Sequence, residues 1–350
     1  MLADLALVGF GNVARRFVRL LEERRDALLR DHDLQLRVVG IATLRHGAVH
    51  DGTGIDAVRA AAIVEAGGSL AELAVHPTTT REPSSDAVIV ALARSAAPLR
   101  TLVETTTLDI AAGQPAIAHV RRALENDCHA VTANKGPAAF AYRELARLAG
   151  ERQRAFLFEG AVMDGIPVFN FVRETLPGVS VEGFRGVVNS TTNHILTALE
   201  DGNEFAAALA HMQAEGIAET DPSLDVQGWD AAAKAAALAN VFLDARVTPH
   251  DVSRTGIDPG TAAAARAAKS RGNRLRLVAA AERGMRPSVK LVELPPGDLL
   301  AGLRGTANAL VLETDTVGRV AIAQLDGGLT HTAYALLSDL ITVRRRTGRS

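Results

Sequence analysis

The fold class is decided near the N-terminus by the stretch Leu5-Ala6-Leu7-Val8-Gly9-Phe10-Gly11-Asn12-Val13-Ala14. Residues 5–8 are apolar and predict a short buried strand, and the apolar residues after the turn return at helical spacing. The first glycine of the turn permits a tight reversal, the second lets the main chain approach a pyrophosphate, and the helix N-terminus supplies N–H groups. The stretch therefore predicts a β-α unit that binds a dinucleotide through Gly9, Gly11, Asn12 and Val13.

Strands and helices continue to alternate after this unit. The pattern predicts strands at residues 34–42, 102–106 and 129–132, and helices at residues 57–66, 85–94 and 114–126. Such alternation is typical of a parallel, doubly wound sheet. We therefore expect an N-terminal Rossmann-type domain.

The regular alternation of predicted strands and helices ends at about residue 150. Strands are predicted at residues 181–188, 275–280, 289–294, 308–314 and 320–324, and helices at 191–199, 229–242 and 332–342. Strands and helices that do not alternate strictly favour an α+β second domain. The expected fold class is thus α/β, with a parallel sheet followed by an α+β part.

Length and charge exclude several classes of protein. A chain of 350 residues fits two modest cores, and a net charge of -2 gives no general attraction to nucleic acid or to an anionic membrane. No apolar run reaches the length of a membrane span, so a soluble chain is expected. The one cysteine, Cys128, excludes an internal disulfide and a thiolate metal cage, and it fits a cytoplasmic location. The basic run Arg344-Arg345-Arg346 is expected to be a solvated tail.

The end of the second predicted strand bears on the choice of nicotinamide cofactor. An acidic side chain there accepts hydrogen bonds from the ribose 2′-hydroxyl of NAD, whereas an arginine suits the 2′-phosphate of NADP. Here the strand ends Gly40-Ile41-Ala42-Thr43-Leu44-Arg45-His46, without an acid. This favours NADP with Arg45 as the contact, and it leaves NAD and a merely solvated Arg45 open.

Three further stretches carry reactive or polar side chains. Residues 131–137 contain Lys135 and follow a strand at the edge of the sheet where ligands collect. Residues 186–196 run from a strand into a hydroxyl-rich helix start, which can bind a carboxylate or a hydroxyl group. Residues 219–234 form an acidic loop and then place Asp230 and Lys234 four residues apart on one helical face. A surface ion pair is the simpler interpretation, but the chain holds lysine only at positions 135, 234, 269 and 290, and arginine cannot replace a lysine that must release its proton.

Taken together, these stretches resemble the homoserine dehydrogenase family. The resemblance covers nearly the whole chain, and its most specific part is the pattern Asp221-Pro222-x-x-Asp225-x-x-Gly228-x-Asp230-x-x-x-Lys234. It also includes the glycine turn and the segments 132–136, 159–167, 189–193, 304–308 and 327–330.

The resemblance implies an NAD(P)-dependent oxidoreductase that transfers hydride reversibly between NAD(P)H and L-aspartate 4-semialdehyde, giving L-homoserine, in threonine and methionine biosynthesis. It implies that Lys135 and Lys234 transfer protons and orient the substrate, with Asp230 beside the reacting hydroxyl. The implied substrate contacts are Glu219 and Asp225 at the amino end, with Ser190 and Thr191 on the adjoining turn. Further implied cofactor contacts are Thr105, Lys135, Gly328 and Thr330. A monovalent cation such as Na⁺ is implied at Glu159, Val162, Asp164 and Ile166, mostly through backbone oxygens.

The resemblance also implies a division of the chain and an assembly. Residues 1–158 would form the dinucleotide-binding domain, completed by 329–350 as the C-terminal helix returns to it. Residues 159–169 and 293–328 would form a dimerisation region, and 170–292 the catalytic substrate domain. We therefore expect a homodimer, and we expect neither a regulatory ACT domain nor a fused kinase.

The sequence departs from the family pattern at a few positions. Met163 and Asp164 occupy a run that is usually glycine, Ser190 replaces a usual glycine, and His194 replaces a usual aromatic residue. These departures keep open a related oxidoreductase that acts on another small amino-acid aldehyde or alcohol. A non-catalytic dinucleotide sensor is the other alternative. An aldehyde dehydrogenase with a cysteine nucleophile is disfavoured, because Cys128 precedes a strand, away from the ligand edge.

Overall fold

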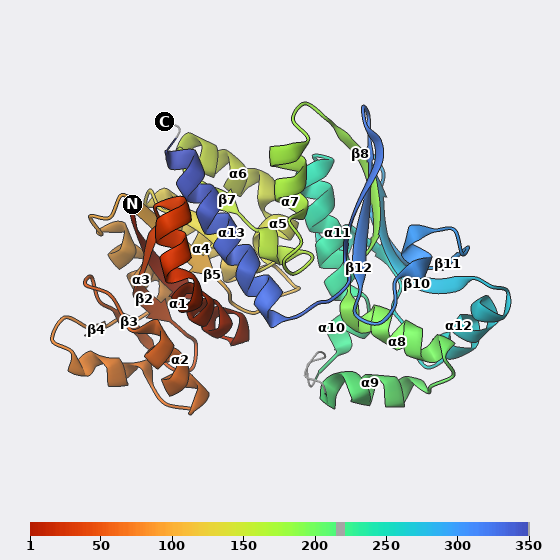
Figure 1. Cartoon of the computed structure of the whole chain (residues 1–350), viewed down its shortest axis with the longest axis horizontal. Coiled ribbons are helices and arrows are strands. Elements are labelled where there is room, and N and C mark those ends of the chain that lie inside the picture. The colour runs from red at the N-terminus through yellow and green to blue at the C-terminus, as the bar shows by residue number, and fades with distance from the viewer. Residues whose placement is uncertain (215–220, 349–350) are drawn as a thin grey trace. The chain divides into compact units, whose positions relative to one another are not determined.

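The predicted strand, glycine turn and helix are present at the N-terminus. Strand β1 (Leu2–Val8) leads through Gly9 into helix α1 (Asn12–His32) (Figure 1). Residues 3–8 of β1 are all buried, which is the pattern of a central strand covered on both faces. The computed structural model describes residues 1–214 and 221–348, except for the side chain of Val75.

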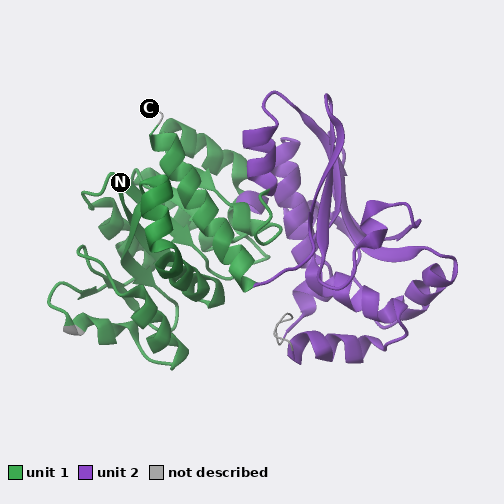
Figure 2. Cartoon of the chain, viewed as in Figure 1, with its two compact units in different colours: residues 1–137, 141–167, 329–350 green, residues 138–140, 168–328 purple. Residues whose placement is uncertain are grey.

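The chain divides into two units (Figure 2). Unit 1 comprises residues 1–137, 141–167 and 329–350, and unit 2 comprises residues 138–140 and 168–328. The helices and strands of unit 1 are β1, α1, β2 (Gln35–Ala42), β3 (Ala48–His50), α2 (Ala57–Glu65), η1 (Leu70–Val75), β4 (Thr80–Arg81), α3 (Ser85–Ala93), β5 (Leu99–Glu104), α4 (Ala116–Glu125), β6 (His129–Thr132), the start of α5 (Gly136–Phe140), α6 (Tyr142–Glu151), β7 (Phe156–Leu157), η2 (Glu159–Ala161) and α13 (Leu329–Thr347).

The sheet of unit 1 has seven strands in the order β4-β3-β2-β1-β5-β6-β7. Strands β2, β1, β5, β6 and β7 are parallel, which confirms the prediction of a parallel sheet. Strands β3 and β4 extend it in antiparallel fashion and were not predicted, because segments of three and two residues are too short to show a periodic pattern.

Helix α13 returns to unit 1 and packs against α1, as the fold class predicted. Leu336, Leu340 and Val343 of α13 share one buried core cluster with Phe17 of α1. The helix runs beyond the predicted 332–342 and includes Arg344, whose guanidinium lies 3.0 Å from the Asp33 carboxylate. The prediction of a solvated arginine tail is therefore wrong for Arg344, whose side chain is only 19% exposed.

Unit 2 combines a second sheet with helices, which confirms the α+β prediction. Its helices and strands are α7 (Val168–Asn170), η3 (Phe171–Thr175), β8 (Val181–Val187), α8 (Ser190–Glu200), α9 (Phe205–Ala214), α10 (Ser223–Val226), α11 (Trp229–Phe242), η4 (Pro249–Asp251), β9 (Ser253–Arg254), α12 (Thr261–Ser270), β10 (Arg274–Glu282), β11 (Ser288–Leu294), η5 (Leu299–Gly302), β12 (Asn308–Thr314) and β13 (Gly318–Gln324). The six strands are ordered β13-β12-β8-β10-β11-β9 and are antiparallel except for the pair β11–β9. Helices α8, α11 and α12 pack on β10, and the predicted hairpin of β12 and β13 is present.

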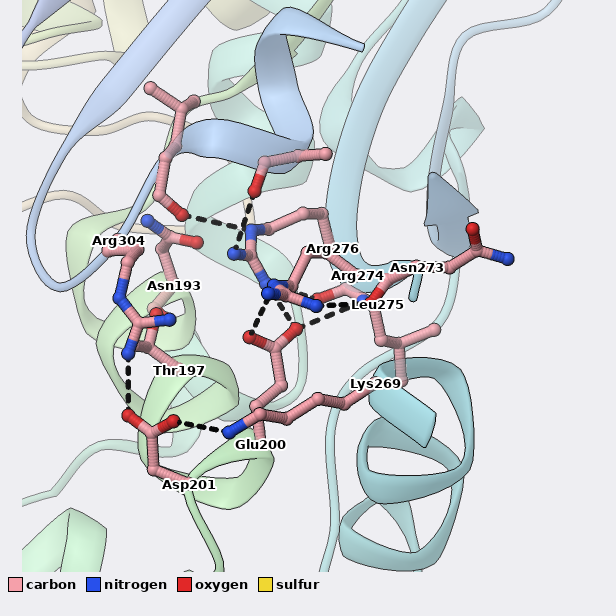
Figure 3. A network of polar contacts seen from close by, with 12 residues as sticks. Asn193, Thr197, Glu200, Asp201, Lys269, Asn273, Arg274, Leu275, Arg276 and Arg304 are labelled. Atoms are coloured by element: carbon pink, nitrogen blue, oxygen red, sulfur yellow. Dashed lines mark hydrogen bonds and ion pairs between the residues drawn. The ribbon is translucent and has the colours of Figure 1, made fainter. Parts of the chain in front are cut away.

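A buried ion pair joins Glu200, at the C-terminal end of α8, to Arg276 on strand β10 of the sheet (Figure 3). The Glu200 carboxylate lies 2.7 Å from the Arg276 guanidinium, and both side chains are 0% exposed. Arg276 also donates to the carbonyls of Ala301 and Leu303, and Glu200 accepts the main-chain N–H of Leu275. The network therefore ties α8, β10 and the η5 segment together, and α8 is the helix whose first turn carries Ser190 and Thr191.

Within residues 1–214 and 221–348, no helix is both long enough and apolar enough to cross a membrane.

Candidate functional site

The glycine turn of unit 1 is shaped for a close approach by a ligand. Gly9 has φ +84°, and a Cβ there would lie 2.5 Å from the carbonyl carbon of Thr105, so only glycine fits without strain. A Cβ on Gly11 would meet no protein atom within 4 Å, so packing does not explain this glycine. The first turn of α1 contains Asn12 and Val13, has no side-chain cap and carries no acid. Its N–H groups and positive dipole end are therefore suited to a phosphate.

Two further turns lie beside the glycine turn at the carboxyl edge of the sheet. Thr105 follows β5 and donates its hydroxyl to the carbonyl of Gly9 at 2.8 Å. Lys135 follows β6 and is the N-cap of α5. Asn134 links these turns, because its side-chain amide donates to the carbonyl of Thr106 at 2.8 Å. The structure thus brings Gly9, Thr105 and the Lys135 turn together. It also shows that β5 ends at Glu104, which corrects the predicted strand at residues 102–106.

Arg45 lies at the tip of the turn that joins β2 to β3. The hydroxyl of Thr43 closes this turn by donating to the carbonyl of Gly47 and accepting the N–H of His46. Arg45 itself is exposed, and the hydrogen bonds and ion pairs found among the described residues do not engage its guanidinium. A basic side chain is therefore presented at the position where a 2′-phosphate is expected.

Thr330 and Gly328, the other expected cofactor contacts, lie at the start of α13. Thr330 is in the first turn of the helix, where its hydroxyl accepts from Nε of Arg16 on α1 at 3.0 Å. Thr330 is therefore held against the helix that follows the glycine turn. Gly328 has φ +156° and is the last residue of unit 2.

The four residues of the predicted cation site lie on one loop of unit 1. Glu159, Val162 and Ile166 are 2%, 1% and 6% exposed. Asp164 has φ +49°, a conformation that aspartate adopts more readily than most residues, and it accepts the hydroxyl of Thr332 at 3.2 Å. No group of three or more histidine, cysteine, aspartate or glutamate side chains within the described part of the chain could hold a metal ion. A site built mostly from backbone oxygens stays a prediction.

Unit 2 gathers a lysine and two carboxylates around one asparagine. Asn189 is the N-cap of α8, and its amide nitrogen donates to Asp225 at 2.7 Å and to Asp230 at 2.9 Å. Lys234 lies one turn after Asp230 on α11, with Nζ 3.0 Å from the Asp230 carboxylate and 2.6 Å from the carbonyl of Val188. The side chains of Lys234 and Asp230 are 12% and 15% exposed. The pair is therefore not the exposed surface ion pair of the simpler interpretation.

This cluster carries one more negative charge than positive when all three groups are ionised. Burial raises the pKa of Asp225, the charge of Asp230 raises it further, and the hydrogen bonds from Asn189 and Thr191 together with the charge of Lys234 oppose the rise. A neighbouring cation would relieve the repulsion between the two carboxylates. The arrangement is therefore suited to a ligand with an ammonium group beside a group that exchanges a proton with Lys234.

The remaining predicted substrate contacts surround this cluster or lie outside the described residues. Ser190 begins α8 and accepts from the amide of Asn308 at 2.8 Å. Thr191 hydrogen-bonds Asp225. Glu219 lies outside the residues that the structure describes.

Sequence reasoning missed Asn189 and Asn308 as organisers of this cluster. Asn189 could have been found, because an asparagine directly before a predicted helix is a common N-cap. The partner of Asn308 lies 118 residues away, and no local pattern indicates such a contact.

The thiol of the chain is not suited to nucleophilic catalysis. Cys128 is buried, and burial raises the pKa of its thiol to about 11. A nucleophilic cysteine needs a stabilised thiolate and access to substrate, so this geometry disfavours a cysteine-based mechanism.

Comparison with known proteins assigns the chain to a family. The model of the homoserine dehydrogenase NAD-binding domain matches residues 9–159, and the homoserine dehydrogenase model matches residues 167–341. The chain belongs to the homoserine dehydrogenase family. It is therefore an NAD(P)-binding oxidoreductase of that family.

Individual homoserine dehydrogenases resemble the chain over its whole length. An NAD(+)-dependent homoserine dehydrogenase of Pseudomonas canavaninivorans is 37% identical over 99% of this chain and 97% of its own. A homoserine dehydrogenase of Methanocaldococcus jannaschii is 35% identical over 98% and 99%. Among solved structures, a hyperthermophilic archaeal homoserine dehydrogenase mutant in complex with NADPH has a TM-score of 0.81 at 29% identity, with 98% of each chain covered. The enzyme of Thiobacillus denitrificans has a TM-score of 0.80 at 27% identity, over 99% of this chain and 74% of its own.

Asp225→Asn should stabilise the protein at neutral pH. The raised pKa of Asp225 means that the folded protein holds this proton more tightly than the unfolded chain. The stabilising contribution is present at low pH and is lost as pH rises from the ordinary value of about 3.9 through the raised value. Urea unfolding should show a gain in the free energy of unfolding at pH 7 that shrinks as pH falls towards 4.

A matched control for this variant is Asp221→Asn. Asp221 lies just before helix α10, which contains Asp225; it is exposed and has a lowered pKa because it accepts hydrogen bonds from Ser223. Its replacement should bring no stability at pH 7. An equal gain from both variants, or no gain from Asp225→Asn, would contradict the account of Asp225.

Proposed function

We propose that this chain catalyses the reversible reduction of L-aspartate 4-semialdehyde to L-homoserine, with NADPH as the preferred hydride donor. The carrying observation is the cluster of Lys234, Asp230 and Asp225 around Asn189. The cluster contains a proton donor and an excess of negative charge. The substrate has a carbonyl oxygen that must be protonated when the carbonyl is reduced, and it also has an ammonium group that the negative charge can bind. The glycine turn of unit 1, with the uncapped N-terminus of α1 and open space at Gly11, is suited to bind the pyrophosphate of the dinucleotide.

The proposed mechanism assigns a role to each group. The nicotinamide cofactor, when bound, supplies the hydride. Lys234 donates a proton to the oxygen that becomes an alkoxide, and Asp230 orients the Lys234 ammonium through their 3.0 Å contact. Asp225 pairs with the substrate ammonium in a charge-assisted hydrogen bond, and Glu219 is proposed to assist it. Lys135, held by the turn after β6, contacts cofactor and substrate.

The role of Asp225 is tested by a substrate that lacks the ammonium group. Succinic semialdehyde has the carbon skeleton of aspartate 4-semialdehyde without the amino group. The wild-type protein should prefer aspartate semialdehyde strongly in kcat/KM, and Asp225→Asn should lose much of this preference by raising KM for the amino substrate. Equal kcat/KM values for both aldehydes in the wild type would contradict ammonium recognition. They would instead favour the related oxidoreductase considered above.

The preference for NADPH rests on Arg45. No acidic side chain stands at the end of β2, and Arg45 is exposed at the tip of the following turn. Arg45→Ala should raise KM for NADPH much more than KM for NADH, since only NADPH carries the 2′-phosphate. Arg24→Ala, on the exposed middle of α1, is the matched control and should change neither value. Equal effects of Arg45→Ala on both cofactors would mean that the protein does not distinguish them through this residue.

The proposed assembly is a homodimer formed through residues 159–169 and 293–328. Strand β13 is an edge strand of its sheet, and four of its seven residues are glycine, alanine or valine: Gly318, Val320, Ala321 and Ala323. Bare edges of this kind favour pairing with another strand. Light scattering should give twice the 36.8 kDa mass of one chain, and a monomer at micromolar concentration would refute the proposal.

Two further expectations remain proposals of the same kind. A cytoplasmic location is proposed from the single buried thiol. A monovalent cation is proposed on the loop that contains Glu159 and Asp164, where it would shape the loop rather than take part in proton transfer.

A further inference from the structure

A buried carboxylate that the mechanism does not use lies beneath the cofactor edge of unit 1. Glu104 is the last residue of β5 and is 0% exposed. It belongs to none of the predicted sites. A charge buried at the carboxyl edge of a parallel sheet is costly unless hydrogen bonds compensate it, so its contacts should reveal its use.

The Glu104 carboxylate joins the ends of two adjacent strands. Its Oε1 accepts the main-chain N–H of Thr106 at 3.0 Å and also the Thr106 hydroxyl. Its Oε2 accepts the hydroxyl of Thr132, the last residue of β6, at 2.9 Å. Nδ1 of His119, on α4, lies 3.6 Å from Oε1. The carboxylate thus spans the turns that follow β5 and β6.

The contacts continue from these threonines to the turn that carries Lys135. The Thr132 hydroxyl accepts the N–H of Asn134 at 2.9 Å, and the side-chain oxygen of Asn134 accepts the N–H of Gly136 at 2.8 Å. Both hydrogen bonds flank Lys135. On the other side, Thr105 stands between Glu104 and Thr106 and donates to Gly9. One carboxylate therefore determines the positions of the Lys135 turn and of the Thr105 contact to the glycine turn.

We propose that Glu104 is a positioning residue that aligns the Thr105 and Lys135 turns for the nicotinamide cofactor. This rests on the proposed function in assigning the cofactor to that edge. Only a carboxylate accepts from three donors with two equivalent oxygens. A glutamine has only one acceptor oxygen. If that oxygen faces Thr106, the glutamine NH₂ group faces the Thr132 hydroxyl, which can then no longer donate to residue 104. The Thr132 hydroxyl must reorient, and the hydrogen bonds from Asn134 to Thr132 and from Gly136 to Asn134 shift with it.

The test uses Glu104→Gln and measures cofactor binding apart from turnover. The dissociation constant for NADPH, followed by its fluorescence, should rise roughly tenfold or more, the effect of losing one hydrogen bond to a charged group. The kcat value should fall in parallel, whereas KM for the aldehyde should change much less, since all of its proposed contacts except Lys135 lie in unit 2. Because binding is measured without turnover, the result stands even if aspartate semialdehyde proves not to be the substrate.

Asp4→Asn is the control for a purely structural role. Asp4 is a fully buried carboxylate in the same sheet, on β1, and it is held by Arg37 at 2.7 Å and by Ser95. Its replacement should lower the melting temperature while the NADPH dissociation constant stays that of the wild type. If Asp4→Asn and Glu104→Gln weaken NADPH binding equally, or if Glu104→Gln binds NADPH like the wild type, the proposal is overturned.

A pair of variants at Thr132 gives an independent readout should Glu104→Gln fail to fold. Thr132→Val keeps the shape of the side chain and removes the hydroxyl between Glu104 and Asn134, so it should weaken NADPH binding in the same direction. Thr132→Ser keeps the hydroxyl and should restore binding. Wild-type binding by Thr132→Val would overturn the proposal.

Discussion

Lys234→Ala should reduce kcat for aldehyde reduction by about 10²–10⁴-fold, the usual contribution of a positioned proton donor. The Lys234 side chain is mostly buried and its Nζ contacts Asp230 and the carbonyl of Val188, so alanine at this position leaves both oxygens without this donor. Lys234→Arg should fail almost as badly, because arginine keeps the charge but does not release its proton. The measurement is steady-state kinetics with the aldehyde and NADPH varied in turn. NADPH binding, measured separately, should show that unit 1 is intact.

Lys269→Ala is the matched control for this experiment. Lys269 is also in unit 2, but its side chain is 41% exposed and pairs with Asp201 on the surface. Its loss should leave kcat unchanged. A near-normal kcat in Lys234→Ala would remove lysine from the mechanism, and full activity in Lys234→Arg would show that the site needs only a positive charge.

Glu200→Gln should destabilise unit 2 by about 3–5 kcal/mol, because it leaves the buried Arg276 guanidinium without a counter-charge. Burial already lowers the pKa of Arg276, and Glu200 opposes that shift. For a unit of this size the loss corresponds to a fall in melting temperature on the order of 5–15 °C. Calorimetry should show the fall in the transition of unit 2.

The adjacent residue provides the control for the ion pair. Asp201 contacts Lys269 and Arg304 near the surface (Figure 3), and exposed pairs contribute only about 0–1 kcal/mol. Asp201→Asn should therefore change the melting temperature little. Replacing both Glu200 and Arg276 by methionine should recover much of the stability lost in Glu200→Gln, since it removes the two buried charges together. A small effect of Glu200→Gln would mean that the Arg276 carbonyl contacts suffice.

Local sequence patterns predicted the elements that have strong periodicity or clear ends. Strand β6 and helix α11 begin and end at the predicted residues. Helix α12 was not predicted, because its sequence Thr261-Ala-Ala-Ala-Ala-Arg-Ala-Ala-Lys-Ser270 lacks the large apolar side chains that reveal a helical face. The end of α13 was misjudged because the contact that orders it joins Arg344 to Asp33, 311 residues away.

The same distinction applies to the site. The relation of Asp230 to Lys234 follows from helical spacing and was predicted. The bridge from Asn189 to Asp225 and Asp230, and the link from Glu104 to Thr132, depend on tertiary contacts. Sequence spacing contains no information on such contacts. These residues hold the predicted groups in place, and only the folded chain shows them.

The central claim is tested most directly by mixing the purified protein with NADPH and L-aspartate 4-semialdehyde and identifying the product. The account predicts that NADPH is oxidised only when the aldehyde is present, and that one L-homoserine forms for each NADPH consumed. It also predicts that L-homoserine and NADP⁺ drive the reverse reaction. Binding of NADPH without turnover would indicate a dinucleotide sensor, and oxidation with a different amino-acid aldehyde alone would indicate a related oxidoreductase. Either result would contradict the assignment.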